Sequence, residues 1–276
     1  MANEPIQSPS AQYEVGAKVA EAPEYRIYLC KQLVTDRRCL LQIASGVEGN
    51  GALERSAFML KRLAVRAEEL EVEYAKVVKD PNRSLGLGYG FPELVESFTS
   101  DEQGGRTINV LAFRNVDDPH RMAPITNIIY KDRLRADLRT SAWIMGKLLK
   151  MLSFTQGSGI AMGQVDTDSV LIEPDEHYVL LFDFSATTTH DDFVPREIRA
   201  KEIAGAAKTV IELVAGNVET GEFPDDEDGR LKPYTDYLLD LASGKQGDAH
   251  IVHGGFYALV DTLWERGFYP ATFLKR

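Results

Sequence analysis

The chain has little cysteine and no long apolar run. Only Cys30 and Cys39 are present, and both lie among apolar residues in predicted strands, where reduced cysteine behaves as a small hydrophobic side chain. We expect both thiols to be reduced and buried; a disulfide between neighbouring strands is the alternative. No apolar stretch approaches the roughly 20 residues that span a bilayer, and residues 1–12 lack a basic start followed by an apolar stretch. These absences predict a cytoplasmic protein without a membrane partner.

An excess of positive charge is also missing. The 31 basic and 42 acidic residues leave a formal charge of −11. Because such a charge repels phosphate backbones, we do not expect nucleic acid as a partner. Of the 276 residues, 44% are hydrophobic, which is enough to bury one large core or two modest lobes. The composition therefore excludes disorder of the whole chain.

The first part of the chain is rich in predicted strands. Residues 1–12 are polar and predict a flexible tail. Alternating apolar residues predict a hairpin of strands over 25–30 and 39–44, preceded by one more strand. From residue 52 to 78, apolar side chains recur at helical spacing among charged ones and predict a long amphipathic helix. The Asp-Pro-Asn run at 80–82 marks its end.

The second part is mainly helical after two further strands, which we place at about 92–98 and 107–113. Periodic apolar residues predict helices over 125–132, 136–155, 196–215, 234–242 and 255–264. A glycine, Gly216, follows the third of these and is typical of a helix C-terminus.

Two segments about a dozen residues apart carry the polar residues of most interest. Residues 162–172 and 179–185 each couple a short apolar strand to polar loop residues. They resemble the HRD-xxxx-N and DFG motifs of the protein-kinase-like fold, with the Asp-Phe-Ser of 183–185 in the place of Asp-Phe-Gly. The order strand-strand-strand-helix-strand-strand resembles the N-terminal lobe of the same fold. The resemblance covers residues 13–273.

This resemblance implies an α+β, two-lobed protein-kinase-like fold. Its N-lobe, residues 13–113, would be an antiparallel five-stranded sheet with one long helix. Residues 114–119 would form the hinge, and residues 120–276 the mainly helical C-lobe.

The resemblance also implies candidate nucleotide-binding residues in the N-lobe. Gly16 alone remains where the family has three loop glycines, and the alternative is an ordinary hairpin turn. Gln42 stands at the lysine position, where an amide brings no charge to a phosphate. Glu54 would be the helix glutamate, although acidic residues are common in the first turn of any helix. Arg114, at the start of the hinge, is the fourth candidate.

Four positions correspond to the catalytic and metal-binding motifs. Gln164 takes the place of the catalytic aspartate and cannot accept a proton as a carboxylate can. Asp166 is either a displaced base or a turn-forming aspartate. Ser169 replaces the metal-binding asparagine and would be a weaker Mg²⁺ ligand. Asp183 could hold Mg²⁺, or it could be a cap or turn aspartate.

Other polar features have plain structural interpretations. Lys18 or Arg38 could replace the missing lysine, although surface solvation is the default for both. The histidines of 250–253 lack further ligands for zinc. The acidic run 225–229 lacks the ligand spacing of an EF-hand and is read as a solvated loop.

Three family positions have thus changed together, to Gln42, Gln164 and Ser169. We therefore predict a degenerate, pseudokinase-like binding or regulatory module that engages a partner protein and has lost phosphotransfer. An atypical ATP- and Mg-dependent phosphotransferase that uses Asp183 and Asp166 is the alternative. A third possibility retains binding of ATP or ADP with Mg²⁺, without transfer, as a switch.

Overall fold

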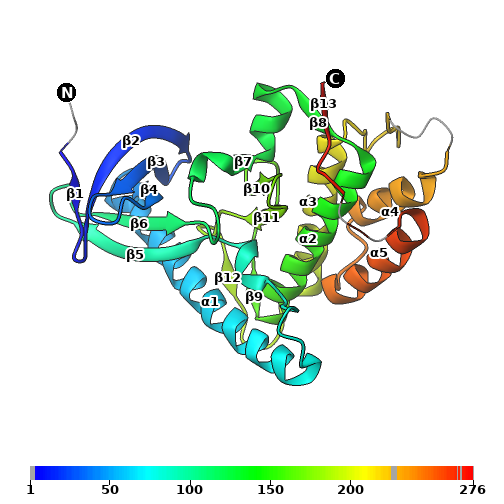
Figure 1. Ribbon diagram of the computed structural model, residues 1–276, viewed down its shortest axis with the longest axis horizontal. Coiled ribbons are helices and arrows are strands. Elements are labelled where there is room, and N and C mark those ends of the chain that lie inside the picture. Colours follow the sequence, from blue (N-terminus) through cyan, green and yellow to red (C-terminus); the bar gives the residue numbers. More distant parts are fainter. Residues whose placement is uncertain (1–3, 225–228, 266, 268, 276) are drawn as a thin grey trace. The chain divides into compact units, whose positions relative to one another are not determined.

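A computed structural model of the protein describes residues 4–224, 229–265, 267 and 269–275 (Figure 1). These residues form two compact units. The N-terminal unit contains the described residues up to Arg121 together with Asp183–Thr187, and the C-terminal unit contains Met122–Phe182 and the described residues from Thr188 onward. Apart from Gly229, the predicted acidic loop at 225–229 lies outside the described residues.

The N-terminal unit is built on an antiparallel sheet with the strand order β1-β2-β3-β4-β6-β5. Its strands are β1 (Ile6–Gln7), β2 (Gln12–Glu21), β3 (Tyr25–Gln32), β4 (Arg38–Ala44), β5 (Glu93–Ser100) and β6 (Arg106–Ala112). Its helices are α1 (Asn50–Val78) and the 3-10 turns η1 (Val47–Gly49), η2 (Leu87–Gly90) and η3 (Pro119–Arg121). Figure 1 shows α1 running beside this sheet.

The long helix α1 follows the predicted range closely. One face of it is apolar and buried against the sheet, with Leu53, Leu60 and Leu63 almost fully enclosed. The helix ends where Lys79 adopts a left-handed backbone conformation with φ 52° and its N–H bonds to the carbonyl of Ala75.

The sheet has six strands among the described residues, rather than the predicted five, because part of the predicted flexible tail is ordered. Ile6 is only 4% exposed, and its strand pairs with the start of β2. The Glu96 carboxylate in β5 accepts hydrogen bonds from the hydroxyls of Ser8 (2.6 Å), Ser10 (2.8 Å) and Tyr13 (2.6 Å). Apolar burial and these bonds offset the entropy lost when the segment is ordered.

The two faces of the sheet bury different side chains. Alternate residues of β4, such as Cys39 and Leu41, pack into an apolar cluster with Ile6 and Tyr13. Cys30 lies directly opposite Cys39 in the register of β3 and β4, and both thiols are free and buried. The other residues of β4 face α1, which places Gln42 on the α1 side of the sheet.

The C-terminal unit is mainly helical. Its helices are α2 (Leu138–Gly157), α3 (Arg196–Leu213), α4 (Lys232–Ala242), α5 (Ala249–Leu263) and the short π-helix η4 (Asn127–Lys131). Its strands are β7 (Ala123–Pro124), β8 (Leu134–Ala136), β9 (Ile160–Ala161), β10 (Val170–Glu173), β11 (Tyr178–Leu181), β12 (Thr188–Thr189) and β13 (Phe273–Lys275). The helix α2 packs against both α3 and α5, and α3 packs against α4 (Figure 1).

Aspartate side chains begin two of these helices. Asp137 accepts a hydrogen bond from the Thr140 N–H at the start of α2 (2.7 Å). Asp248 accepts bonds from the N–H groups of His250 and Ile251 at the start of α5. Because of this cap, α5 begins six residues before the predicted start at 255. In the described part of the chain, none of the helices combines the length and the apolar character required to traverse a lipid bilayer.

Candidate functional site

Gln42, at the position of the family's lysine, belongs to a buried amide network. It is only 1% exposed, and its side-chain oxygen accepts a hydrogen bond from the Asn109 amide of β6 (3.2 Å). The same Asn109 amide also donates to the carbonyl of Leu53 in α1 (3.0 Å). Gln42 therefore helps to join β4, β6 and α1 through neutral groups.

Tyr25 extends this network from Gln42 to Asp183. The tyrosine is 5% exposed at the start of β3, and its hydroxyl lies near the side chains of Asp183 and Gln42. Burial raises the pKa of Tyr25 far above its ordinary value, and the negative charge of Asp183 and hydrogen bonding with it raise this pKa further. The phenol is therefore neutral at physiological pH and lies near the Asp183 carboxylate.

The segment Asp183–Thr187 belongs to the N-terminal unit, and a backbone carbonyl of the segment accepts a hydrogen bond from α1. Asp183 Oδ1 accepts the N–H of Ser185 (2.8 Å), which closes a tight turn, and Phe184 between them is fully buried. Arg55 of α1 donates to the Ser185 carbonyl (2.7 Å). Its neighbour Glu54 is exposed, so Arg55 is the residue of this helical turn that reaches the segment.

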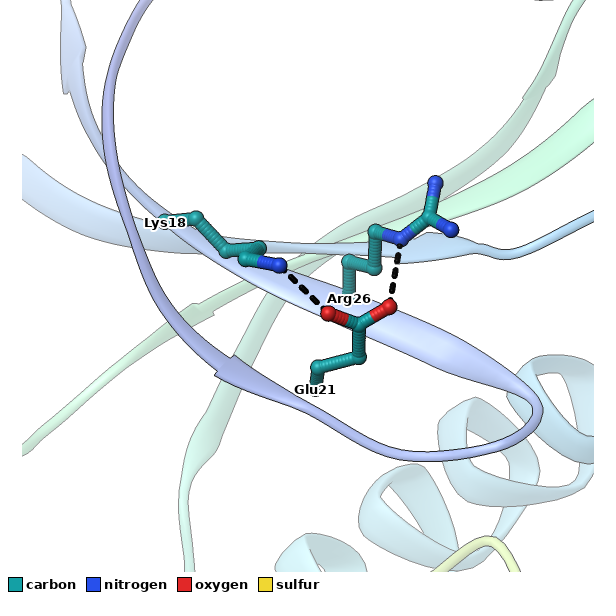
Figure 2. Close-up of polar contacts among 3 residues, drawn as sticks. All are labelled: Lys18, Glu21 and Arg26. Carbon is teal, nitrogen blue, oxygen red and sulfur yellow. Dashed lines mark hydrogen bonds and ion pairs between the residues drawn. The ribbon is translucent and has the colours of Figure 1, made fainter.

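The β2–β3 hairpin holds Gly16 and Lys18. Gly16 lies at an irregularity in the pairing of the two strands, where a Cβ would stand 3.2 Å from the Leu29 carbonyl oxygen. Figure 2 shows that Lys18 and Arg26 converge on the carboxylate of Glu21. All three side chains are solvated, and the Lys18 charge already has a carboxylate partner.

Arg114 lines a cavity of about 640 Å³ in the N-terminal unit. Its guanidinium donates to the Gly88 carbonyl and lies over the Phe91 ring, 5.4 Å from the centroid. Two other arginines that line the cavity, Arg37 and Arg38, are paired with Glu93 and Asp118. The cavity thus mixes basic and acidic groups, and Arg38, the second candidate to replace the lysine, is engaged there.

The catalytic-type loop lies in the C-terminal unit and is closed by its own hydrogen bonds. Asp166 Oδ1 accepts the N–H groups of Asp168 (3.1 Å) and Ser169 (2.9 Å), and its other oxygen accepts the amide of Gln164. The Ser169 hydroxyl accepts the Asp166 N–H (2.9 Å) and donates to the Asp166 carbonyl (3.2 Å). Asp166 therefore caps a turn, and Ser169 holds that turn from the other side.

Glu202 in α3 anchors the start of this loop. It was not among the site residues predicted from the sequence. It is 2% exposed and accepts hydrogen bonds from the N–H groups of Met162 and Gly163 (3.1 Å) and from the Gln156 amide (2.8 Å). Burial raises the pKa of Glu202, while these hydrogen bonds act in the opposite direction. A carboxylate within the apolar face of a predicted helix was the available signal.

One turn further along α3, Gly205 allows the loop to approach the helix closely. A Cβ at this position would stand 2.6 Å from the carbonyl oxygen of Val165. Glu202 and Gly205 together fix the loop backbone on α3, through hydrogen bonds at one point and close packing at the next.

The two side chains proposed to bind Mg²⁺ each already make hydrogen bonds within their own unit. Asp183 Oδ1 accepts the Ser185 N–H, and the Tyr25 phenol lies near the carboxylate. The Ser169 hydroxyl is used within its turn. Across the described ranges, no three His, Cys, Asp or Glu side chains are grouped so that they could bind a metal ion.

The structure thus brings Gln42 and Asp183 together through Tyr25 in one unit, and Gln164, Asp166 and Ser169 together in the other. Glu54, Gly16 and Arg114 lie elsewhere in the N-terminal unit.

Comparison with known proteins defines the fold. No protein-family model and no curated protein sequence matches the chain. Among solved structures, vaccinia related kinase 3 is similar with a TM-score of 0.59 and 13% identity, covering 95% of this chain and 91% of that one. The BubR1 kinase domain is similar with a TM-score of 0.62 and 10% identity, covering 95% and 84%. With its antiparallel β lobe, long helix and helical lobe, the chain has a protein-kinase-like fold.

Proposed function

We propose that this protein is a pseudokinase-like binding or regulatory module that has lost phosphotransfer and acts through a partner protein. The observation that carries the proposal is the buried phenol of Tyr25 beside Asp183. In the protein-kinase-like fold this aspartate corresponds to the one that holds the metal, and here a neutral, buried phenol lies beside it.

The lysine position of the N-terminal unit carries no positive charge for phosphate binding. Phosphoryl transfer depends on cations placed around the phosphates. Gln42 brings no charge and is bonded to Asn109, while Lys18 and Arg38 are paired with carboxylates. Lys18 or Arg38 would have to leave its carboxylate partner to supply the positive charge that the family's lysine provides.

The catalytic-type loop supports the same conclusion. Gln164 cannot act as a base, and both carboxylate oxygens of Asp166 are engaged within the turn. One general acid or base contributes about 10² to 10⁴ in rate. Because groups that act as a unit are not additive, the loss of several leaves little activity by the usual route.

A thermal-shift titration with ATP and ADP, with and without Mg²⁺ or Mn²⁺, tests the proposal. A ligand at one hundred times its Kd would stabilise the folded protein by about 2.7 kcal/mol. We expect no metal-dependent shift in the wild type. A metal-dependent shift that disappears in Asp183→Ala would show a working nucleotide site, and a phosphotransfer assay would then separate the nucleotide-binding switch from the phosphotransferase alternative.

The Tyr25→Phe variant separates obstruction by the phenol from absence of a site. It removes the hydroxyl that lies beside Asp183, and Tyr28→Phe, on the opposite face of the same strand, is its control. A metal-dependent shift that appears in Tyr25→Phe alone would show that the phenol obstructs a site that is otherwise intact. A shift in neither variant would show that removal of the phenol does not restore a site.

A further inference from the structure

The helix α1 carries an exposed apolar stripe on the face opposite the one that packs against the sheet. Phe58, Val65 and Val72 are 58%, 59% and 51% exposed and are spaced seven residues apart. On a helix this spacing aligns side chains along one side, as in a coiled-coil seam. The 29 residues of α1 span about 44 Å, long enough for a pairing of several turns.

The charges beside this stripe are arranged in two blocks. The basic residues Lys61 and Arg62 precede Val65, and the acidic residues Glu68, Glu69, Glu71 and Glu73 follow it. Arg66, directly after Val65, pairs with Glu69 of its own helix (2.9 Å). Lys61, Arg62, Glu68 and Glu69 are exposed and flank the stripe. The exposed face of α1 is therefore apolar along its middle, basic just before Val65 and acidic after it.

We propose that this face binds the same face of a second copy of the chain, with the two α1 helices antiparallel and the two-fold axis at Val65. In this arrangement Val65 meets Val65 of the second copy. Phe58 packs against Val72 of the second copy, and the reciprocal contact forms at the other end. The interface is isologous, so both copies use one patch.

Charge complementarity selects this partner and this direction. With Val65 on the axis, Lys61 lies beside Glu68 of the second copy, and Arg62 lies beside Glu69 on the other side of the stripe. Each pair occurs twice, so four pairs of opposite charge border the apolar contact. A parallel arrangement in register would place the basic blocks against each other, and like charges oppose association.

The expected dimer is weak, reversible and sensitive to salt. Three apolar side chains from each copy make a small interface, at the low end of the size range of specific complexes. The bordering charges are solvated, and salt screens such pairs. Sedimentation equilibrium of the full chain at increasing concentration is therefore expected to show a monomer–dimer equilibrium that shifts to monomer at high ionic strength.

Charge reversal provides the test of orientation. We expect Lys61→Glu/Arg62→Glu and Glu68→Lys/Glu69→Lys each to weaken self-association at least about tenfold, because like charges then face each other. Mixed together, the two variants should form a heterodimer. These side chains are exposed, so far-UV circular dichroism should show unchanged folding.

Cross-linking locates the axis. With a short bis-maleimide, Val65→Cys should give a covalent dimer, whereas Val77→Cys, 81% exposed but on another side of α1, should not. The native thiols of Cys30 and Cys39 are buried. A wild type that stays monomeric, a dimer unchanged by both charge reversals, mixed variants that do not associate, or equal cross-linking at residue 77 would each overturn the proposal.

Discussion

Replacing Glu202 with alanine is expected to lower the free energy of unfolding by about 3–5 kcal/mol. The substitution leaves the backbone N–H groups of Met162 and Gly163 and the amide of Gln156 without their buried acceptor. Each buried donor left unpaired costs roughly 1–3 kcal/mol. Urea denaturation followed by circular dichroism measures the loss.

Glu197→Ala is the matched control, because Glu197 lies in the first turn of the same helix and is exposed. Its effect should stay within about 0.5 kcal/mol. A loss for Glu202→Ala no larger than that of the control would contradict the anchoring role of Glu202.

Glu202 should also make the stability of the protein depend on pH in a known direction. Burial raises the pKa of Glu202 in the folded state, so the folded protein holds this proton more tightly than the unfolded chain. The contribution to stability is present below the unfolded value of about 4.3 and is lost as pH rises through the folded pKa. Glu202→Gln does not titrate at this position. As pH rises from about 4.3 through the folded pKa, the wild type should therefore lose stability relative to this variant. An equal pH dependence of both proteins would contradict a raised pKa for Glu202.

The second large effect is expected at Gly205. An added Cβ would stand 2.6 Å from the Val165 carbonyl oxygen, so the loop or the helix has to move. We expect Gly205→Ala to destabilise the protein by about 1–3 kcal/mol, the usual cost of overpacking. A destabilising effect would be informative, because alanine in a helix is otherwise favoured over glycine by about 1 kcal/mol.

Gly254→Ala is the control for helix propensity. Gly254 lies within α5, is exposed, and has no atom within 4 Å of an added Cβ. This variant should be stabilised by about 0.5–1 kcal/mol. Chemical denaturation measures the free energy of unfolding of both variants. Equal stabilisation of both would show that the loop does not limit the space for a side chain at residue 205.

The sequence located the long elements because their patterns are long. The helix α1 (Asn50–Val78) begins two residues before the predicted range and ends at the predicted residue, since its apolar face extends over the whole helix. The strand β4 (Arg38–Ala44) begins one residue before the predicted strand at 39–44. Periodicity over many residues is a stronger signal than any single residue.

The ordered part of the N-terminal segment could not be predicted, because its stability comes from distant residues. Ile6 and Ser8 lie in a polar stretch with no periodicity of its own. They are buried because β2 offers a partner strand and Glu96, far along the chain, accepts the hydroxyls. Contacts of this kind have no local signature.

The candidate site was predictable in position and less so in its bonding. The resemblance placed Gln42 and Asp183 at family positions, but the link through Tyr25 depends on the packing of β3 beside β4. Glu202 was missed because its main partners are backbone N–H groups, so its one sign in the sequence was a carboxylate on the apolar face of a predicted helix.

The proposed loss of phosphotransfer is tested most directly with ATP labelled at the γ-phosphate. The full chain is incubated with Mg²⁺ or Mn²⁺ and a range of hydroxyl acceptors, and label transfer and ATP hydrolysis are followed beside Asp183→Ala. We predict that the wild type and Asp183→Ala give the same background. Metal-dependent transfer by the wild type that is absent in Asp183→Ala would contradict the central claim.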